Sequence, residues 1–553
     1  MLALALAVRG IYLLEIRRLD PFYGFAFDGF DQKTYQAQAQ DILEGDWLLR
    51  RWGLFYYSPL YGYFCGLLFR LGGAGNFDLL HLVQALLGVG SVLLLWSLAR
   101  TYLSRAEALA AGVIAAGVRA WLFYEQVLLA EGLIVFLHLL TLRLCRRAER
   151  LDAPARVALL GAGLAAGWAY LGRGNFLAVA VAFIVWLGVR WWAAAKASPA
   201  LRGRAAAGLA LFGLGLAIVL IPLAARNRVA AGRWRFGTTN GPAMLYLGNA
   251  ADATGIFAYS PRFEAAHARS GEDPGIYLRR LREDLIQHPG RIAFNLLRKT
   301  AYFWNAYDLP DNTNLYLGRA FSVILRWTPA TEWTLLSLGL LGAGLSLGRW
   351  RQESLLWVYL LIFSASIILI VPVGRYKIPV LIPLVIFAAR AIGWLRAALG
   401  NLRWKPLATA AAALTLVGAL AWPGQPPRRQ DYSTFIRACL DQRRYGAVER
   451  LFAWGDRDYP GAPELANLRL RLYVETGDWP AARRQAQLLR SQGAYTRQGV
   501  AALVELLLWE GQVEEARELL RGALSADPAD PRFQELSRRL EAGGSTGADG
   551  DGR

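Results

Sequence analysis

The chain has 553 residues, of which 55% are hydrophobic, and its mean hydropathy is +0.27. This composition excludes an ordinary water-soluble globular protein, because the apolar residues are gathered in long runs that end near Trp422. The net charge is +19, but many of the basic residues stand in short loops between these runs, so the charge does not indicate nucleic-acid binding.

Crossing the hydrocarbon core of a bilayer takes about 20 mostly apolar residues. Eleven runs reach or approach this length, and they predict an all-α, multi-pass membrane protein. Arg9 interrupts the first run, which lacks the basic start and the small-residue cleavage site of a signal peptide. The predicted spans are 1–17, 78–99, 106–123, 126–143, 157–171, 175–193, 205–225, 332–348, 354–372, 377–395 and 406–422.

Arg and Lys concentrate in every second loop between these spans, which is the pattern of the positive-inside rule. Those loops are expected to face the cytoplasm, and the alternate loops, together with everything after residue 423, are expected to face outward. The basic residues are Arg100, Arg105, Arg143, Arg146, Arg147, Arg150, Arg156, Arg190, Lys196, Arg202, Arg204, Arg349, Arg351, Arg396, Arg403 and Lys405.

The first outward loop carries two carboxylates beside the bilayer, Asp28 and Asp31. An amphipathic run from Lys33 to Trp47 follows, and then Tyr57-Ser58-Pro59-Leu60-Tyr61. An ionised carboxylate at an aqueous membrane edge can act as a general base toward an acceptor hydroxyl or amine. Alternatively, Asp31 caps the helix that begins after it, because Asp is favoured at that position. Both interpretations remain open at this point.

Further ionisable residues stand at the outward ends of the predicted spans. Charged groups there are costly, so they are either functional or reach to the interface as anchors. Arg and Lys beside a cavity suit a phosphate, the first as a bidentate fork and the second as a point charge. These residues are Arg119, Glu125, Glu131, Arg173, Arg375 and Lys377.

The outward segment 226–331 is too long for a plain connection, and we expect it to fold over the face of the bilayer. It contains Lys299 and the aromatic stretch from Tyr302 to Asp308, which could bind a sugar. The same aromatic residues also fit an interfacial belt.

Residues 423–429 read as a Pro-rich linker, because prolines stop the preceding helix. Residues 430–541 repeat with a period of 34, since Gly477-Asp478-Trp479 corresponds to Gly511-Gln512-Val513. This period and the Gly at each turn predict tetratricopeptide-like helical repeats that bind a protein partner. Residues 542–553 are Gly- and Asp-rich and are predicted to be a disordered tail.

The sequence gives little support for metal or nucleotide chemistry. The three cysteines lie in separate segments, and only four histidines are present, so no zinc-ligand spacing occurs. No phosphate-binding loop, dinucleotide fingerprint or nucleophile elbow is found.

The order of these motifs resembles the GT-C class of integral-membrane glycosyltransferases, in particular the protein-mannosyltransferase and aminoarabinose-transferase-like branch, family 39. The resemblance covers most of the chain, and a tetratricopeptide tail is familiar among bacterial members. The residues that carry it are Asp31-x-x-x-Tyr35-x-x-x-Ala39, Gly45-Asp46-Trp47, Tyr57-x-Pro59-Leu60-Tyr61, Tyr124-Glu125, Glu131, Arg173-x-Asn175, Gly248-Asn249 and Arg375-Tyr376-Lys377-x-Pro379.

The resemblance implies a GT-C-like fold and the transfer of a sugar, with inversion, from a polyprenyl-phosphate-linked donor to an acceptor on the extracytoplasmic face. It implies a multi-pass protein of the bacterial inner membrane, with the active site and the C-terminal domain outside the cytoplasm. No cofactor or divalent metal is expected. The implied roles are base for Asp31, phosphate binding for Arg375, Lys377, Arg173 and Lys299, and acceptor binding or network contacts for Glu125, Glu131, Tyr57 and Tyr61.

One departure concerns the base. Many relatives carry an acidic pair at the first-loop site, whereas here Gln32 follows Asp31 and the other carboxylate is Asp28, so the base is one of these two. Two other function classes are compatible with the sequence. A transporter of lipid-linked glycans would show inverted repeats and midplane charges, and neither is found. A membrane-tethered repeat scaffold would not need so many spans.

Overall fold

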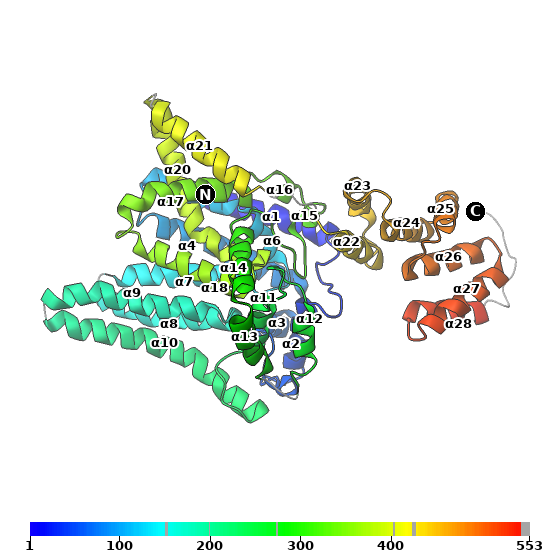
Figure 1. Cartoon of the computed structure of the whole chain (residues 1–553), viewed down its shortest axis with the longest axis horizontal. Coiled ribbons are helices and arrows are strands. Elements are labelled where there is room, and N and C mark those ends of the chain that lie inside the picture. Colours follow the sequence, from blue (N-terminus) through cyan, green and yellow to red (C-terminus); the bar gives the residue numbers. More distant parts are fainter. Residues whose placement is uncertain (150–152, 198, 272–274, 402–403, 423–426, 543–553) are drawn as a thin grey trace. The chain divides into compact units, whose positions relative to one another are not determined.

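The computed structural model describes residues 1–149, 153–197, 199–271, 275–401, 404–422 and 427–542 (Figure 1). The chain divides into two compact units. The first comprises Met1–Arg18 and Phe22–Gln425, and the second comprises Leu19–Pro21 and Pro426–Arg553. Helices make up the described part of the chain, which contains no strand beyond one isolated bridge between Asp311 and Thr313. The predicted all-α class is therefore confirmed.

Each predicted span overlaps at least one helix of the first unit. Most of these helices run side by side as a bundle (Figure 1). They are α1 (Leu2–Leu19), α4 (Phe77–Ala99), α5 (Arg105–Ala116), α6 (Arg119–Gln126), α7 (Glu131–Ala148), α8 (Ala153–Gly172), α9 (Phe176–Ala197), α10 (Pro199–Ala231), α17 (Glu332–Ser346), α18 (Ser354–Ile370), α20 (Leu381–Gly400) and α21 (Trp404–Leu420).

Length and composition identify four helical stretches that can cross a membrane within the described residues, namely Phe77–Ala99, Ala155–Gly172, Arg202–Ala231 and Gly374–Gly400. These stretches support a membrane protein. Shorter apolar helices, such as Ser354–Ile370, accompany them. The count of eleven spans stays a prediction.

The span predicted at 106–123 is broken rather than continuous. Helices α5 and α6 meet at a bend of 45°. The break lies at Gly117 and Val118, where the backbone of Val118 is extended. There the amide of Arg119 donates to the carbonyl of Ala330, which an unbroken helix would not allow. The fourth predicted span, 126–143, likewise begins later, at Glu131.

The charge inside the first predicted span is paired. Arg9 of α1 is buried, and its Nη2 lies 3.0 Å from Oε2 of Glu125 in α6. A buried charge is costly unless it is paired, so the ion pair explains how α1 accommodates Arg9.

Small residues allow a close helix contact between α8 and α10. A Cβ on Gly163 of α8 would collide with the carbonyl of Phe212 in α10, and one on Gly215 would collide with the carbonyl of Leu160. Backbones that approach this closely gain van der Waals packing, which is a main source of helix association in lipid.

At one end of the bundle, shorter helices replace the spans. The amphipathic run that was predicted from Lys33 forms α2 (Asp31–Leu43), which packs on α3 (Leu60–Gly72). The long segment 226–331 also folds there, after α10 ends at Ala231. Its helices are α11 (Gly241–Asn249), α12 (Pro261–His267), α13 (Ile276–Gln287), α14 (Pro289–Phe303), α15 (Leu315–Gly318) and α16 (Val323–Trp327).

The second unit is a series of helices with a 34-residue repeat. The first helix of each pair begins at residue 429, 463, 497 or 531. Val448, Ala482 and Ala516, which occupy the small-residue position of the repeat, are fully buried. The helices are α22 (Arg429–Asp441), α23 (Val448–Asp458), α24 (Pro463–Thr476), α25 (Trp479–Gln492), α26 (Arg497–Trp509), α27 (Val513–Ala526) and α28 (Pro531–Ala542).

The assignment of these repeats to the tetratricopeptide type stays a prediction. Residues 423–426 of the predicted linker and residues 543–553 of the predicted tail lie outside the described residues. Ala542, the first residue of the predicted tail, instead closes α28.

Candidate functional site

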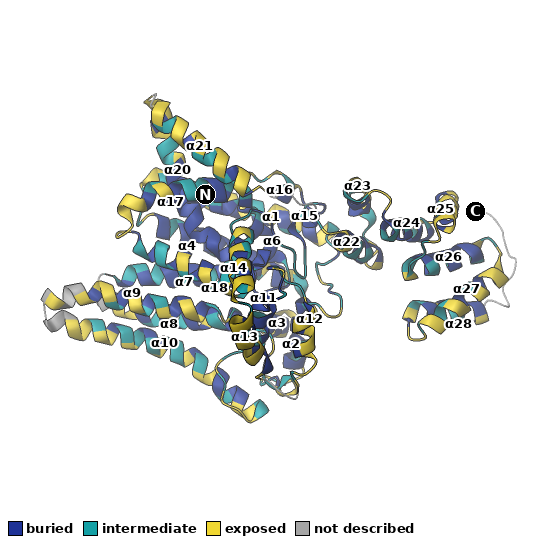
Figure 2. Ribbon diagram, in the orientation of Figure 1, coloured by how far each residue is buried: buried dark blue, intermediate teal, exposed yellow. Residues whose placement is uncertain are grey.

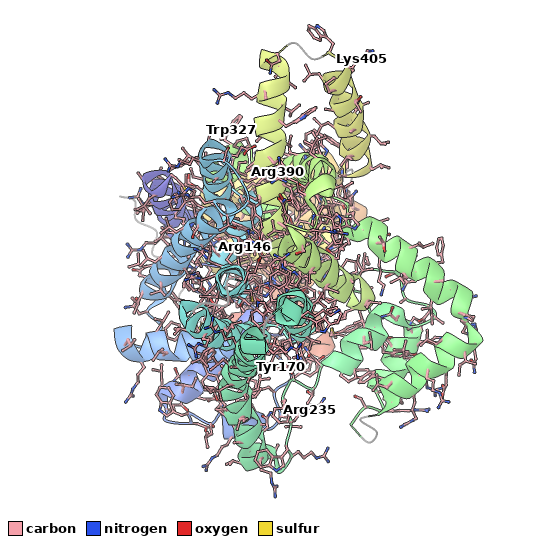
Figure 3. All side chains as sticks on the ribbon, turned by 90° about the vertical axis from the view of Figure 1, so that its left-hand side faces the viewer. Arg146, Tyr170, Arg235, Trp327, Arg390 and Lys405 are labelled. Carbon is pink, nitrogen blue, oxygen red and sulfur yellow. The ribbon has the colours of Figure 1, made fainter. Side chains whose placement is uncertain are left out.

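A cavity of about 390 Å³ lies where α2, α8, α9, α11 and α18 end or begin. Tyrosines form much of its wall, including Tyr35, Tyr57 and Tyr376, as well as Tyr170, which Figure 3 labels. Charged side chains line it as well, namely Asp31, Glu131, Arg173 and Arg375. Leu177, Met244, Ile367 and Ile370 add an apolar side. A cavity with one apolar wall and a few convergent polar groups is the usual form of a small-molecule site.

Arg375 lies at the centre of the charged groups and contacts two carboxylates. Its Nη2 lies 2.7 Å from Oδ2 of Asp31 and 2.6 Å from Oδ2 of Asp311. All three side chains are nearly buried, with exposed fractions of 8%, 11% and 12% respectively. Burial strengthens such contacts because water no longer screens them.

A second guanidinium stands beside the first. Arg173 forms an ion pair with Glu131, and its guanidinium lies over the ring of Tyr376, 4.1 Å from the ring centre. Oε1 of Glu131 is also 3.9 Å from Nη1 of Arg375. Oε2 of Glu131 and Nε of Arg375 are buried without a hydrogen-bond partner in the described part of the chain. We call Asp31, Glu131, Asp311, Arg173 and Arg375 the arginine–carboxylate cluster.

The cluster can bind a phosphate at Nη2 of Arg375 only if a carboxylate is displaced, because this nitrogen already contacts Asp31 and Asp311. It holds three carboxylates against two guanidinium groups, so its members sum to one negative charge in their ordinary states. Two arginines on one cavity are suited to a phosphate, because each offers a planar fork of donors. A carboxylate released from Arg375 is then available as a base.

Asp31 is the first residue of α2, and it does not cap the helix. The capping position belongs to Phe30, which makes no side-chain capping bond. Instead the amide of Asp31 donates to Oδ1 of Asn312 at 3.4 Å, and Nε2 of Gln32 donates to the carbonyl of Asn312 at 3.5 Å. The capping interpretation of Asp31 is therefore wrong.

Asp28 points away from the cluster. Its side chain is 93% exposed, and its only ion pair among the described residues joins Oδ1 to Nζ of Lys33 at 3.7 Å. Of the two carboxylates in the first loop, only Asp31 lines the cavity.

The two lysines that were predicted to bind the donor phosphate do not line the cavity. Nζ of Lys299 donates to Oδ1 of Asn249 at 2.7 Å and to the carbonyl of Ile370 at 3.1 Å. Nζ of Lys377 donates to the carbonyls of Asn305 and Tyr307, at 3.0 Å and 2.9 Å. Burial lowers the pKa of Lys299 to about 8. Lys299 thus binds carbonyls in the last turn of α18, and Lys377 binds carbonyls of the loop after α14.

Of the four residues predicted to contact the acceptor, two line the cavity and two do not. Glu131 and Tyr57 line the cavity. Glu125 instead pairs with Arg9. Tyr61 donates to Oε1 of Gln84 at 2.6 Å, so it too is used within the helix packing.

The sequence interpretation missed the loop that supplies Asp311. This loop follows α14 and reaches Arg375 through Asp311, while Asp308 accepts a hydrogen bond at 2.7 Å from the hydroxyl of Tyr124. Burial raises the pKa of Asp308 to about 7, and it also raises the pKa of Asp311, against the effect of Arg375. A useful signal was present in Asp308-Leu309-Pro310-Asp311-Asn312, a polar turn directly after the aromatic stretch.

Within the described residues, no group of three or more His, Cys, Asp or Glu side chains is arranged to hold a metal ion. The carboxylates of the cluster pair with guanidinium groups.

Among solved structures, the chain is similar to an oligosaccharyltransferase from Archaeoglobus fulgidus in its apo form. The identity is 14% and the TM-score 0.41, and the alignment covers 88% of this chain and 68% of the other. The same organism's oligosaccharyltransferase AglB, in complex with an inhibitory peptide and a dolichol-phosphate, matches at 14% identity and a TM-score of 0.38. That alignment covers 82% of this chain, which spans only 60% of AglB. No curated protein sequence matches.

A family model also matches part of the chain. It describes dolichyl-phosphate-mannose-protein mannosyltransferases and matches residues 57–221, which run from Tyr57 into α10 and include Glu131 and Arg173. The resemblance predicted from the sequence is therefore confirmed over this segment. Residues 57–221 carry the sequence pattern of the dolichyl-phosphate-mannose-protein mannosyltransferase family, and this match supports a membrane glycosyltransferase.

Proposed function

We propose that this protein transfers a sugar from a polyprenyl-phosphate-linked donor to an acceptor on the extracytoplasmic side of a bacterial inner membrane. The observation that carries the proposal is the contact between Asp31 and Arg375 at the wall of one cavity. This contact supports the proposal because it puts a candidate base and a guanidinium that can bind a phosphate side by side in one cavity.

In the proposed reaction, the donor phosphate lies against Arg375 and Arg173. A nucleophilic oxygen or nitrogen of the acceptor attacks the anomeric carbon, while Asp31 takes its proton. The bond between that carbon and the phosphate oxygen breaks, and the bonding electrons stay with the phosphate. The two guanidinium groups stabilise the charge that develops there. One displacement at the anomeric carbon inverts its configuration.

Binding of the donor also frees the base. In the structure, Asp31 is held by Arg375 at 2.7 Å, and Asp311 holds the same nitrogen at 2.6 Å. A phosphate that takes the place of Asp31 on Arg375 leaves this carboxylate beside the acceptor. Asp311 then keeps the guanidinium in position. Glu131, whose Oε2 has no hydrogen-bond partner in the described part of the chain, can accept a hydrogen bond from a sugar or acceptor hydroxyl.

The test is a transfer assay in membranes that contain the full-length protein and a labelled polyprenyl-phospho-sugar. We expect Asp31→Asn to lower the rate by about 10²-fold or more, because a positioned base contributes about 10²- to 10⁴-fold. Asp28→Asn is the matched control, since its side chain is exposed and outside the cavity, and it should transfer at the wild-type rate. Equal transfer by wild type and Asp31→Asn would remove Asp31 as the base. Absence of transfer from every polyprenyl-phospho-sugar tested would contradict the donor class.

A further inference from the structure

Helices α13 and α14 expose apolar side chains that nothing in the described structure covers. On α13, Leu278 is 51% exposed and Ile286 is 70% exposed. On α14, Phe294 is 65% exposed and Leu297 is 69% exposed. Figure 2 shows that exposed residues continue along both helices. A face of this kind on an ordered helix marks an interaction surface.

The opposite faces of both helices are firmly attached. Asn295 is buried and donates to the carbonyl of Gly248 at 2.9 Å, and Lys299 is buried one turn further along α14. On α13, buried Asp284 accepts the amide of Ala251 at 2.9 Å. The two helices therefore cannot turn to hide their apolar side chains, and the exposed face has a fixed direction.

The helices lie across the bundle rather than along it. In Figure 1, α14 runs at a steep angle to α8 and α10, which contain two of the four candidate spans. In Figure 3, the green segment that contains α13 and α14 extends to one side of the bundle. A helix that crosses α8 and α10 at a steep angle can lie along the plane of a bilayer that these two helices cross.

Basic side chains accompany the apolar face. Arg282 is exposed and stands four residues from both Leu278 and Ile286, so the three share one side of α13. Arg291 is exposed at the start of α14, one turn before Phe294. Apolar side chains flanked by Arg are typical of helices that lie in the membrane interface, where anionic lipids attract the guanidinium groups.

We propose that α13 and α14 form a bilayer-bound surface at the cavity end of the bundle. Leu278, Ile286, Phe294 and Leu297 enter the boundary between head groups and acyl chains, and Arg282 and Arg291 contact phosphates of anionic phospholipids. The proposal is independent of the proposed transferase function. Membrane binding would also hold the end of α14 in place, and α14 leads directly into the loop that supplies Asp311 to the arginine–carboxylate cluster.

The experiment uses the full-length protein reconstituted in vesicles of phosphatidylcholine that contain one quarter phosphatidylglycerol. Cys65, Cys145 and Cys439 are buried, so an introduced surface cysteine can be labelled selectively with an environment-sensitive fluorophore. The labelled variants are Phe294→Cys and Leu297→Cys. The matched control is Glu264→Cys on α12, an exposed position on a helix that lies farther from the spans than α14 in Figure 1.

Lipids brominated on the acyl chain are the quenchers. We expect them to remove most of the fluorescence at positions 294 and 297 and little at position 264. Replacing phosphatidylglycerol with phosphatidylcholine should reduce quenching, and Arg282→Gln with Arg291→Gln should abolish this lipid dependence. Equal, weak quenching at all three positions would overturn the proposal and favour a protein partner on this face. Strong quenching without any dependence on anionic lipid would overturn the role of the two arginines.

Discussion

The guanidinium of Arg375 and the carboxylate of Asp31 are in direct contact at 2.7 Å, although 344 residues separate them in the chain. The contact joins the start of α2 to the short turn before α20, and Asp311 completes it from a third segment. An ion pair that is almost wholly buried contributes little to the stability of a fold, because removing both charges from water costs free energy. At a cavity wall, however, such a pair can bind an anionic ligand, which displaces a carboxylate from Arg375.

The first prediction concerns the shape of the cation at position 375. Arg375→Lys keeps the charge but removes the guanidinium whose Nη2 contacts two carboxylates, and Arg and Lys are not equivalent at such sites. We expect transfer to fall by about 10²- to 10³-fold, the cost of losing one positioned donor in a catalytic site. The measurement is the initial rate at saturating donor. Arg269→Lys, at an exposed position outside the cavity, should leave the rate unchanged.

The second prediction concerns the negative charge of Asp311 beside the donor phosphate. Neutralising it in Asp311→Asn removes one negative charge beside Arg375. The KM for an anionic donor should therefore fall by about tenfold, because one charge at this range is worth one to a few kcal/mol. Donor titrations of the wild type and the variant would measure this. An unchanged or raised KM would mean that Asp311 does not oppose the donor phosphate.

The same variant gives a pH test with a defined sign. Burial raises the pKa of Asp311, so this carboxyl takes up its proton at a higher pH than an exposed Asp. As the pH falls through that range, the wild type loses the competing charge, and its KM for the donor should decrease toward the value of Asp311→Asn. The variant differs from the wild type at this one carboxyl, so the difference between the two pH profiles isolates Asp311.

The third prediction concerns stability and Asp308. Burial raises the pKa of Asp308 to about 7, so the folded protein favours the protonated carboxyl. A group whose pKa is raised on folding stabilises the fold at pH values below its unfolded pKa, and this contribution is lost as the pH rises through the folded pKa. Stability should therefore fall between about pH 4 and pH 7, by about 4 kcal/mol in the limit of full burial.

Asp308→Asn should remove this pH dependence. The amide oxygen of Asn can still accept the hydrogen bond from Tyr124 that Asp308 accepts at 2.7 Å, so packing is preserved. The measurement is the thermal unfolding midpoint of the detergent-solubilised protein at several pH values. Identical pH profiles for the wild type and the variant would contradict the assignment.

The fourth prediction concerns the helical repeats. Gly477 and Gly511 occupy equivalent positions and have positive φ values of 73° and 78°. Arg443, one repeat earlier, has a φ of 51° without being Gly. A left-handed conformation costs an ordinary L-residue roughly 1 kcal/mol, so Arg443→Gly should stabilise the first repeat by about that amount. Slower hydrogen exchange of the amides in α22 and α23 of the full-length protein would confirm it, with Arg469→Gly in the interior of α24 as a destabilised control.

Much of the helical architecture could be predicted, because it depends on local patterns. Apolar runs predicted helices over every span, and the predicted 34-residue period recurs in the starts of α22, α24, α26 and α28. The bend between α5 and α6 was missed, since it depends on a hydrogen bond from Arg119 to Ala330 far along the chain.

The candidate site was less accessible from the sequence. The charge and position of Asp31, Arg173, Glu131 and Arg375 pointed to them, and all four line the cavity. Lys299 and Lys377 carry the same kind of charge, but their ammonium groups donate to backbone carbonyls at the end of α18 and in the loop after α14. A residue type does not reveal which way its side chain points.

The sequence alone determined that this is an α-helical chain with membrane-crossing segments and a repeating C-terminal unit, because hydropathy and periodicity are properties of neighbouring residues. Only the tertiary structure decided which charges meet. Asp28 and Asp31 are three residues apart, and one is exposed while the other is buried against Arg375. That difference arises from contacts with Asn312 and Asp311, which lie about 280 residues further along the chain and reach α2 only when the bundle has formed.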